Sequence, residues 1–176
     1  MGSEIIKTID RVEDAYKTLE RNIAWINHAD NKASILLAVV AVLFGSTLFF
    51  NNITTFIIDD TNYLYIRMVV ALTAIAYGLV SLLSIIFLFL VVKSRINNDL
   101  KKSLLFFGDI VNMTVEEFKA GFKTLTTDEL LDKILEQVFV TSQIASTKFK
   151  HLNVTYVLVT MGIILAIILS SLISVF

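Results

Sequence analysis

Three long stretches without a charged residue divide the chain. They cover residues 33–50, 68–92 and 152–176. A helix needs ~20 apolar residues to cross a hydrocarbon core of ~30 Å, a length that the second and third stretches exceed and the first approaches. The pattern therefore predicts three transmembrane helices, with residues 51–67 as a short loop between the first two.

Apolar residues before the first stretch recur at alternating spacings of four and three. The series is Ile5, Ile9, Val12, Tyr16, Leu19, Ile23 and Ile26. Such a heptad seam is typical of a helix that packs along one side. No glycine or proline separates it from the first span, so residues 1–32 are predicted to continue into that span as one helix. The seam is expected to pack on the chain's own second polar segment, and self-association as a coiled coil is the alternative.

The second polar segment, residues 93–151, is predicted to be helical as well. The second span has no breaker at its exit, so its helix is expected to continue to about Ile110. Two capping-box pairs follow, Thr114 with Glu117 and Thr126 with Glu129. Each pair predicts that a helix starts directly after its threonine. We expect Gly121 to end or loosen the first of these helices, and the second to run without interruption into the third span.

Composition fits this arrangement and excludes several classes of protein. The 176 residues are 56% hydrophobic and only 18% charged, and they include no cysteine and no proline. A simple soluble enzyme, a disulfide scaffold and a disordered chain are therefore excluded. The net charge of -1 gives no reason to expect nucleic acid as a partner. The predicted fold is an all-α integral membrane protein with three transmembrane helices that extend into a cytoplasmic helical bundle.

The distribution of lysine and arginine predicts the orientation. Residues 1–32 carry five of them, residues 51–67 one, and residues 93–151 nine. Because cytoplasmic segments are rich in these residues, the N-terminus and residues 93–151 are predicted to be cytoplasmic. The first span is not expected to be a cleaved signal peptide, because a signal n-region is short and basic, unlike residues 1–32.

Catalytic constellations are missing from the sequence. Only His28 and His151 offer imidazoles, their spacing fits no common zinc site, and there is no phosphate-binding glycine motif. We therefore expect neither an enzyme nor a metal protein. The spans carry no charged residue, which argues against a pump or a coupled transporter.

Small residues recur every four positions in all three spans. They are Ala41 and Gly45, Ala74 and Gly78, and Gly162, Ala166, Ser170 and Ser174. Such faces let helices approach closely. They fit packing within one protomer and oligomerisation equally well.

Polar residues gather where the spans meet the predicted cytoplasmic side. Asn27, Asp30, Asn31 and Ser34 share one helical face by their spacing. Tryptophan and lysine often anchor a span at the interface, but an aspartate and amides do not. A buried network or a ligand site is therefore predicted here, with simple solvation as the alternative.

Three patches of the sequence carry a resemblance to a known family. They are WINHADNKAS at residues 25–34, LLFFGDIVNMT at residues 104–114, and QVFVTSQIASTKFKHL at residues 137–152. In this order relative to the spans, they resemble the Pycsar transmembrane effector family from about residue 10 onward. The resemblance implies a role in bacterial antiphage defence. A cyclase of such a system makes cUMP or cCMP, and the effector responds by impairing the inner membrane.

The resemblance, taken together with the groups that a cyclic nucleotide needs, gives a candidate nucleotide-sensing patch. Its members are Trp25, Asn27, Asp30, Asn31, Lys32, Phe107, Asp109, Gln137 and Lys148. Lysines suit the phosphate, amides suit the pyrimidine edge, and aromatic rings suit stacking. The ligand expected is cUMP or cCMP without a further cofactor, and the expected assembly is a homo-oligomer in the lipid bilayer. The alternative is a non-enzymatic membrane scaffold or subunit that recruits a protein through its cytoplasmic helices.

Overall fold

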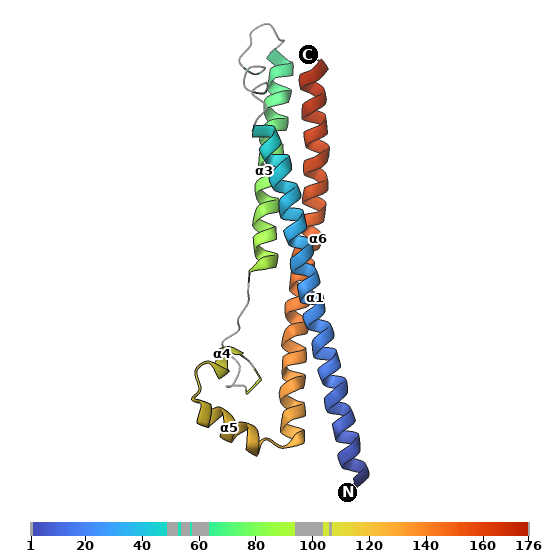
Figure 1. Ribbon diagram of the computed structural model, residues 1–176. Helices are drawn as coiled ribbons and strands as arrows, with labels where there is room; N and C mark the ends of the chain where they lie inside the picture. The colour runs from blue at the N-terminus through green and yellow to red at the C-terminus, as the bar shows by residue number, and fades with distance from the viewer. Residues whose placement is uncertain are drawn as a thin grey trace. The chain divides into compact units, whose positions relative to one another are not determined.

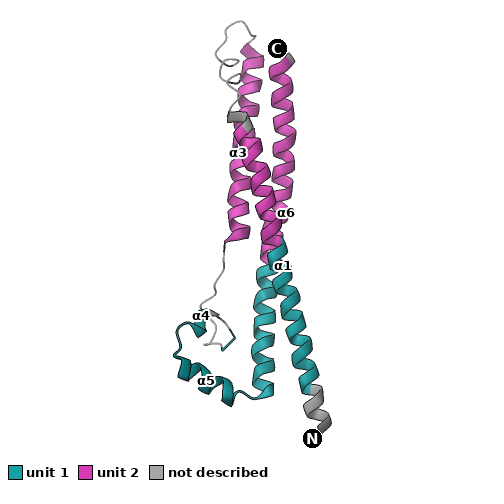
Figure 2. Cartoon of the chain, in the orientation of Figure 1, with its two compact units in different colours: residues 1–28, 94–146 teal, residues 29–93, 147–176 magenta. Residues whose placement is uncertain are grey.

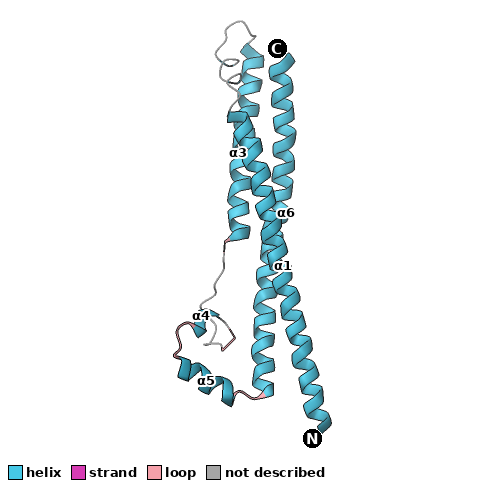
Figure 3. Cartoon of the chain, in the orientation of Figure 1, coloured by secondary structure: helices cyan, strands magenta, loops and turns pink. Residues whose placement is uncertain are grey.

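The described part of the chain is built from helices. The computed structural model describes residues 2–48, 53, 57, 64–93, 104–105 and 107–175, and within them it contains no strand (Figure 3). The helices are α1 (Gly2–Leu48), α3 (Leu64–Val92), α4 (Phe107–Ile110), α5 (Val115–Thr124) and α6 (Thr127–Val175) (Figure 1). The all-α prediction is confirmed.

Three of these helices are long and apolar enough to cross a membrane. The segments that meet this criterion are Thr8–Gly45, Leu64–Val92 and Thr127–Ser174. Each contains most of one predicted span. The expected loop at residues 51–67 lies largely outside the described residues, and α3 begins inside it, at Leu64. Arg67, in the first turn of α3, donates from Nε to the Ile57 carbonyl at 2.7 Å.

Both predicted capping boxes form. The Thr114 hydroxyl accepts from the Glu117 amide, and the Glu117 carboxylate accepts from the Thr114 amide. Thr126 and Glu129 make the same reciprocal pair at the start of α6. Gly121 does not end α5, which continues through it to Thr124. A side-chain carbon there would lie 3.1 Å from the Leu104 side chain, so the glycine accommodates a neighbour.

The predicted extension of the second span is wrong. Helix α3 ends at Val92, and Lys93 lies in a bend, although its amide still donates to the Phe89 carbonyl. The last carbonyls of a helix lack partners within the helix and need other donors. Lys148 of α6 supplies one of these donors, to the carbonyl of Val91. A side chain from a different helix thus caps the end that the sequence alone left open.

The chain forms two compact units, which Figure 2 colours separately. Unit 1 contains residues 1–28 and 94–146, and unit 2 contains residues 29–93 and 147–176. Helices α1 and α6 contribute to both units.

In unit 1, α1 packs against α6 along one stripe. Ala15 of α1 and Ile134 of α6 are buried, with 7% and 3% of their surface exposed. The Asn22 amide donates to the Val138 carbonyl at 3.1 Å and to the Ser142 hydroxyl at 2.8 Å. The sequence predicts that the apolar seam of α1 packs on the second polar segment. These contacts between α1 and α6 confirm that prediction.

The apolar seam itself is split between two environments. Val12, Leu19 and Ile26 are half-buried, and they share a stripe with Ala15 and Asn22. The alternate positions of the seam, Ile9, Tyr16 and Ile23, are exposed at 53%, 54% and 44%. The side chain of Ile5 lies outside the described residues. The side of α1 that packs on α6 therefore contains Ala15 and Asn22 in place of the exposed apolar positions. Because these side chains are small or polar, α6 can approach α1 closely.

Unit 2 contains two apolar clusters. The first joins all three helices and consists of Ala29, Ala33, Val40, Leu88, Val91, Leu152 and Val159. The second consists of Ile66, Val70 and Leu169, with Ile53, Ile57 and Leu172 packed against it. Large apolar side chains also cover the outside of α3, including Leu72, Ile75, Leu79, Leu82 and Phe89. An apolar exterior of this kind suits hydrocarbon rather than water.

Candidate site at the ends of three helices

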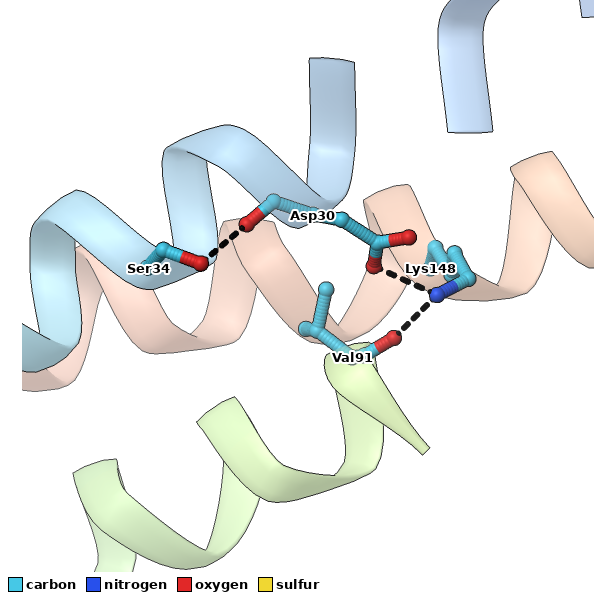
Figure 4. Close-up of polar contacts among 4 residues, drawn as sticks. All are labelled: Asp30, Ser34, Val91 and Lys148. Atoms are coloured by element: carbon cyan, nitrogen blue, oxygen red, sulfur yellow. Dashed lines mark hydrogen bonds and ion pairs between the residues drawn. The ribbon is translucent and has the colours of Figure 1, made fainter. Parts of the chain in front are cut away.

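A buried lysine connects the three helices of unit 2. The Lys148 ammonium donates to Asp30 Oδ1 at 2.5 Å and to the Val91 carbonyl at 2.6 Å. These partners belong to α1 and α3, as Figure 4 shows. The Lys148 side chain is 9% exposed, whereas that of Asp30 is 37% exposed. One cation therefore neutralises a carboxylate of one helix and caps the end of another.

The local sequence explains how the lysine reaches both partners. Ala29 and Ala33 flank Asp30 on α1, and both are fully buried. Because alanine is small, α6 can lie close to α1 at this level. Leu152, one turn beyond Lys148, is 1% exposed and packs in the same cluster as Val91.

Lys148 lies where a helix end and a carboxylate meet. A cation near the C-terminus of a helix interacts favourably with the helix dipole and with the unpaired carbonyls. Asp30 supplies the countercharge through Oδ1 (Figure 4). The Ser34 hydroxyl donates to the Asp30 carbonyl at 2.9 Å, which adds a bond within α1. The site thus holds a matched pair whose acid remains partly accessible to solvent.

The remaining residues of the predicted patch are divided between the two units. In unit 2, Asn31 and Lys32 are exposed, and the Lys32 ammonium lies 6.0 Å from the centre of the Phe149 ring. In unit 1, Trp25 is 55% exposed, with its ring centre 6.1 Å from that of His28, and Asn27 is exposed. Among the nine predicted residues, Asp30 and Lys148 bond to each other.

Three further members of the predicted patch lie in unit 1. Asp109 is half-buried in α4, and its carbonyl accepts from the Asn112 amide at 3.1 Å. Gln137 is half-buried in α6, and its carbonyl accepts from the Thr141 hydroxyl at 2.7 Å. Phe107 begins α4, and its side chain lies outside the described residues.

The structure adds features that sequence reasoning missed. The carbonyl of Val91 carries no sequence signal, because any residue offers the same acceptor. Unit 1 also contains a groove of about 450 Å³, lined by Arg11, Asp14, Ala15 and Thr18 of α1 and by Leu131, Leu135 and Val138 of α6. Its volume lies within the ~300–1,000 Å³ typical of ligand sites. The polar residues of α1 recur there at spacings of three and four, a signal that the sequence did contain. Within the described ranges, no group of three histidine, aspartate or glutamate side chains is placed to hold a metal ion.

Comparison with known proteins gives a consistent result. The model of the Pycsar effector protein domain matches residues 14–175. The Pycsar effector protein GmPycTM of Gulbenkiania mobilis is 31% identical, over 80% of this chain and 82% of the relative. No solved structure matches the chain.

Proposed function

The chain belongs to the Pycsar effector family, and from this membership we propose that it is a membrane effector of bacterial antiphage defence that responds to cUMP or cCMP. In this proposal the activated protein impairs the inner membrane as a homo-oligomer and performs no catalysis. The family match covers both the long apolar helices and the segment between them.

We infer that the N-terminus and residues 94–146 face the cytoplasm, where a cyclase would release the messenger. Support comes from the five and nine basic residues of segments 1–32 and 93–151, against one in residues 51–67. Both basic segments contribute to unit 1. Unit 1 is thus the part of the protein that a soluble messenger would meet first.

The observation that carries the mechanism is the double engagement of Lys148. Its ammonium bonds both the Asp30 carboxylate and the Val91 carbonyl, so three helix segments depend on one cation. A cyclic mononucleotide carries one negative phosphate charge, and phosphate accepts strong bonds from lysine. We propose that the phosphate competes with Asp30 for this cation. Loss of the pair would free the end of α3 and let the three helices repack.

A ligand shifts a conformational equilibrium only if it binds the two states with different affinity. Exchange of Asp30 for phosphate at Lys148 supplies such a difference, because the contact exists only after the pair has opened. The groove of unit 1 is the second candidate place for the messenger. Arg11 and Thr18 there can donate to phosphate, and Leu131 and Leu135 can contact the base.

Liposome leakage tests the proposal. Purified protein is reconstituted, and release of a trapped dye is measured with cUMP, cCMP, cAMP and no nucleotide. We expect the wild type to leak with one pyrimidine messenger. Lys148→Ala lacks the pair from the start, so it should leak to the same extent with and without nucleotide. Lys150→Ala is the matched control, because Lys150 lies two residues away and is exposed. A nucleotide dependence of Lys148→Ala equal to that of the wild type would refute the role of the lysine, and no leakage by inserted wild-type protein would refute the effector function.

The variant Arg11→Ala separates the two candidate places for the messenger. If the groove of unit 1 holds the phosphate, this variant needs more nucleotide for half-maximal leakage while its unliganded stability stays unchanged. If the phosphate instead displaces Asp30, Arg11→Ala responds as the wild type does.

The exposed half of the α1 seam supports a homo-oligomer. It also fits the scaffold alternative, in which another protein binds the cytoplasmic helices. Ile9, Tyr16 and Ile23 lie seven residues apart and leave an apolar stripe exposed on unit 1. A parallel helix of a second copy would fit this stripe. Crosslinking of the purified protein in detergent distinguishes the occupants. Crosslinked homo-oligomers favour self-association, whereas a second protein retained without any nucleotide response favours a scaffold.

A further inference from the structure

Polar side chains line the interior of unit 2. Of the residues that the structure describes, the buried polar or charged ones are Ser81, Ser84, Lys148 and Thr155, and all four belong to this unit. Tyr77 is a fifth, with 4% of its surface exposed. The same helices present large apolar side chains on their outer surface. These polar groups are buried beside the apolar clusters of the unit, whereas the outer surface is apolar. Polar side chains inside a membrane protein commonly face the bundle interior or a water-filled cavity.

These residues follow one line along α3 and α6. The buried stripe of α3 contains Tyr77, Ser81 and Ser84 in succession, at spacings of four and three. The His151 ring lies 6.0 Å from the Phe87 ring, and a side-chain carbon at Gly162 would lie 3.8 Å from Val80. The two helices are therefore antiparallel, because residues later in α6 meet residues earlier in α3. This register places Thr155 near the level of Ser84.

The line is long on the scale of a membrane. From Val91, whose carbonyl bonds Lys148, to Tyr77 there are fourteen helical residues. At ~1.5 Å per residue they cover about 21 Å, which is roughly two thirds of a ~30 Å hydrocarbon core. Apolar side chains of the first cluster, such as Leu88 and Leu152, are buried at the same levels as these polar residues. Beyond Tyr77 lies the second apolar cluster, Ile66, Val70 and Leu169.

Two buried polar atoms on this line have no hydrogen-bond partner among the residues that the structure describes. They are the Tyr77 hydroxyl and His151 Nδ1. A buried polar group without a partner costs about 1–3 kcal/mol. Ser84 and Thr155 satisfy their own hydroxyls by donating to the Val80 and His151 carbonyls, at 2.8 and 3.0 Å. Each of these hydroxyl oxygens keeps a lone pair that accepts from a further donor.

We propose that Tyr77, Ser81, Ser84, His151 and Thr155 line a hydrated path for water and small cations inside each protomer. The path begins at the Asp30–Lys148 pair and is closed at its other end by the cluster of Ile66, Val70 and Leu169. Water in the path would satisfy the Tyr77 hydroxyl and His151 Nδ1, since a buried water needs two to four polar partners. We further propose that this path carries the leak of the activated effector, and this part of the proposal rests on the proposed function.

Silver ions test the path directly, because the chain contains no cysteine. Ag⁺ is a small cation that binds thiols. Ser84→Cys places a thiol on the path. Leu83→Cys places one on the outer surface of the same helix turn, where Leu83 is 45% exposed. Proteoliposomes are treated with Ag⁺ without any messenger, and the thiols that remain free are labelled with maleimide after denaturation. We expect Ag⁺ to protect Ser84→Cys at least tenfold faster than Leu83→Cys. Equal protection rates would overturn the proposal.

A second measurement asks whether the path carries the leak. Ag⁺ bound to Ser84→Cys should block messenger-triggered proton flux, and Ag⁺ should leave Leu83→Cys unaffected. Tyr77→Phe should reduce the flux severalfold, whereas Tyr156→Phe should not, because Tyr156 is 41% exposed on the outside of α6. Unchanged flux through silver-bound Ser84→Cys would overturn the path as the route of the leak while the effector function stands. Absence of flux in the wild type, with Ser84→Cys still protected, would refute the effector function and leave the hydrated path in place.

Discussion

The ion pair between Asp30 and Lys148 gives the sharpest stability prediction. Asp30→Asn preserves the shape of the side chain but leaves a 9% exposed ammonium without its countercharge. Removal of one partner from a buried pair costs ~3–5 kcal/mol. The 37% exposure of Asp30 weakens the pair through solvent screening, so we expect a loss of about 2–3 kcal/mol in the free energy of unfolding.

The reverse variant should cost less. Lys148→Met keeps most of the apolar stem, and the remaining Asp30 carboxylate can be hydrated through its exposed part. The main loss of stability then comes from the Val91 carbonyl, which no longer has a hydrogen-bond donor. An unsatisfied buried acceptor costs about 1–3 kcal/mol, so we expect a loss of about 1–2 kcal/mol.

The double variant tests the reasoning. Asp30→Asn with Lys148→Met contains no uncompensated charge, so its loss should stay near that of Lys148→Met alone. The sum of the two single losses is about 4 kcal/mol, which gives a coupling energy of about 2 kcal/mol. Unfolding by sodium dodecyl sulfate in mixed micelles, followed by circular dichroism, measures each value. Lys150→Met is the exposed control. A double variant within about 0.5 kcal/mol of the sum would show that the two side chains act independently.

Three further expectations follow from helix packing and capping. A side-chain carbon at Gly78 meets no atom within 4 Å, so Gly78→Leu should leave protomer stability unchanged but reduce crosslinked oligomers if this face joins two copies. Gly162→Leu should instead destabilise the protomer, because the added side chain meets Val80; equal melting temperatures of the two variants would contradict this. Bonds from the Thr126 amide and hydroxyl hold the pKa of Glu129 below its ordinary value. A lowered folded-state pKa stabilises the folded form above the ordinary value of 4.5, and this contribution is lost as the pH falls through the folded-state pKa. The protection factors of the amides at the start of α6, which correct for the intrinsic pH dependence of exchange, should therefore fall in acid, and Glu129→Gln should abolish that fall.

The parts of the fold that depend on neighbours in sequence were predicted well. Thr114 with Glu117 and Thr126 with Glu129 start their helices where expected, because a capping box uses bonds across three residues. The sequence also predicted the three long apolar helices, because the length of a membrane helix is set by bilayer thickness. Asp30 and Lys148 were singled out as polar residues at a membrane boundary, but the sequence contained no sign that the two side chains pair.

The sequence failed where a distant segment decides the outcome. Helix α3 ends at Val92, where the Lys148 ammonium bonds the carbonyl of Val91, 57 positions away along the chain. Likewise, the seam of α1 offered seven apolar positions, and α6 packs on the stripe that contains Ala15 and Asn22. Hydrophobic periodicity reports that a helix has an apolar side, but the size and bonding of the partner decide which part of that side is covered.

The sequence by itself therefore determined that this is an all-helical membrane protein, where its long helices lie, and how two of its helices begin. Only the tertiary structure decided that Lys148 joins Asp30 to the end of α3, and that Tyr77 and Ser84 face an interior rather than lipid. The physical reason is the distance along the chain over which each interaction acts. Capping and membrane length act within a few turns of one helix, whereas pairing and burial depend on which surfaces of separate helices meet.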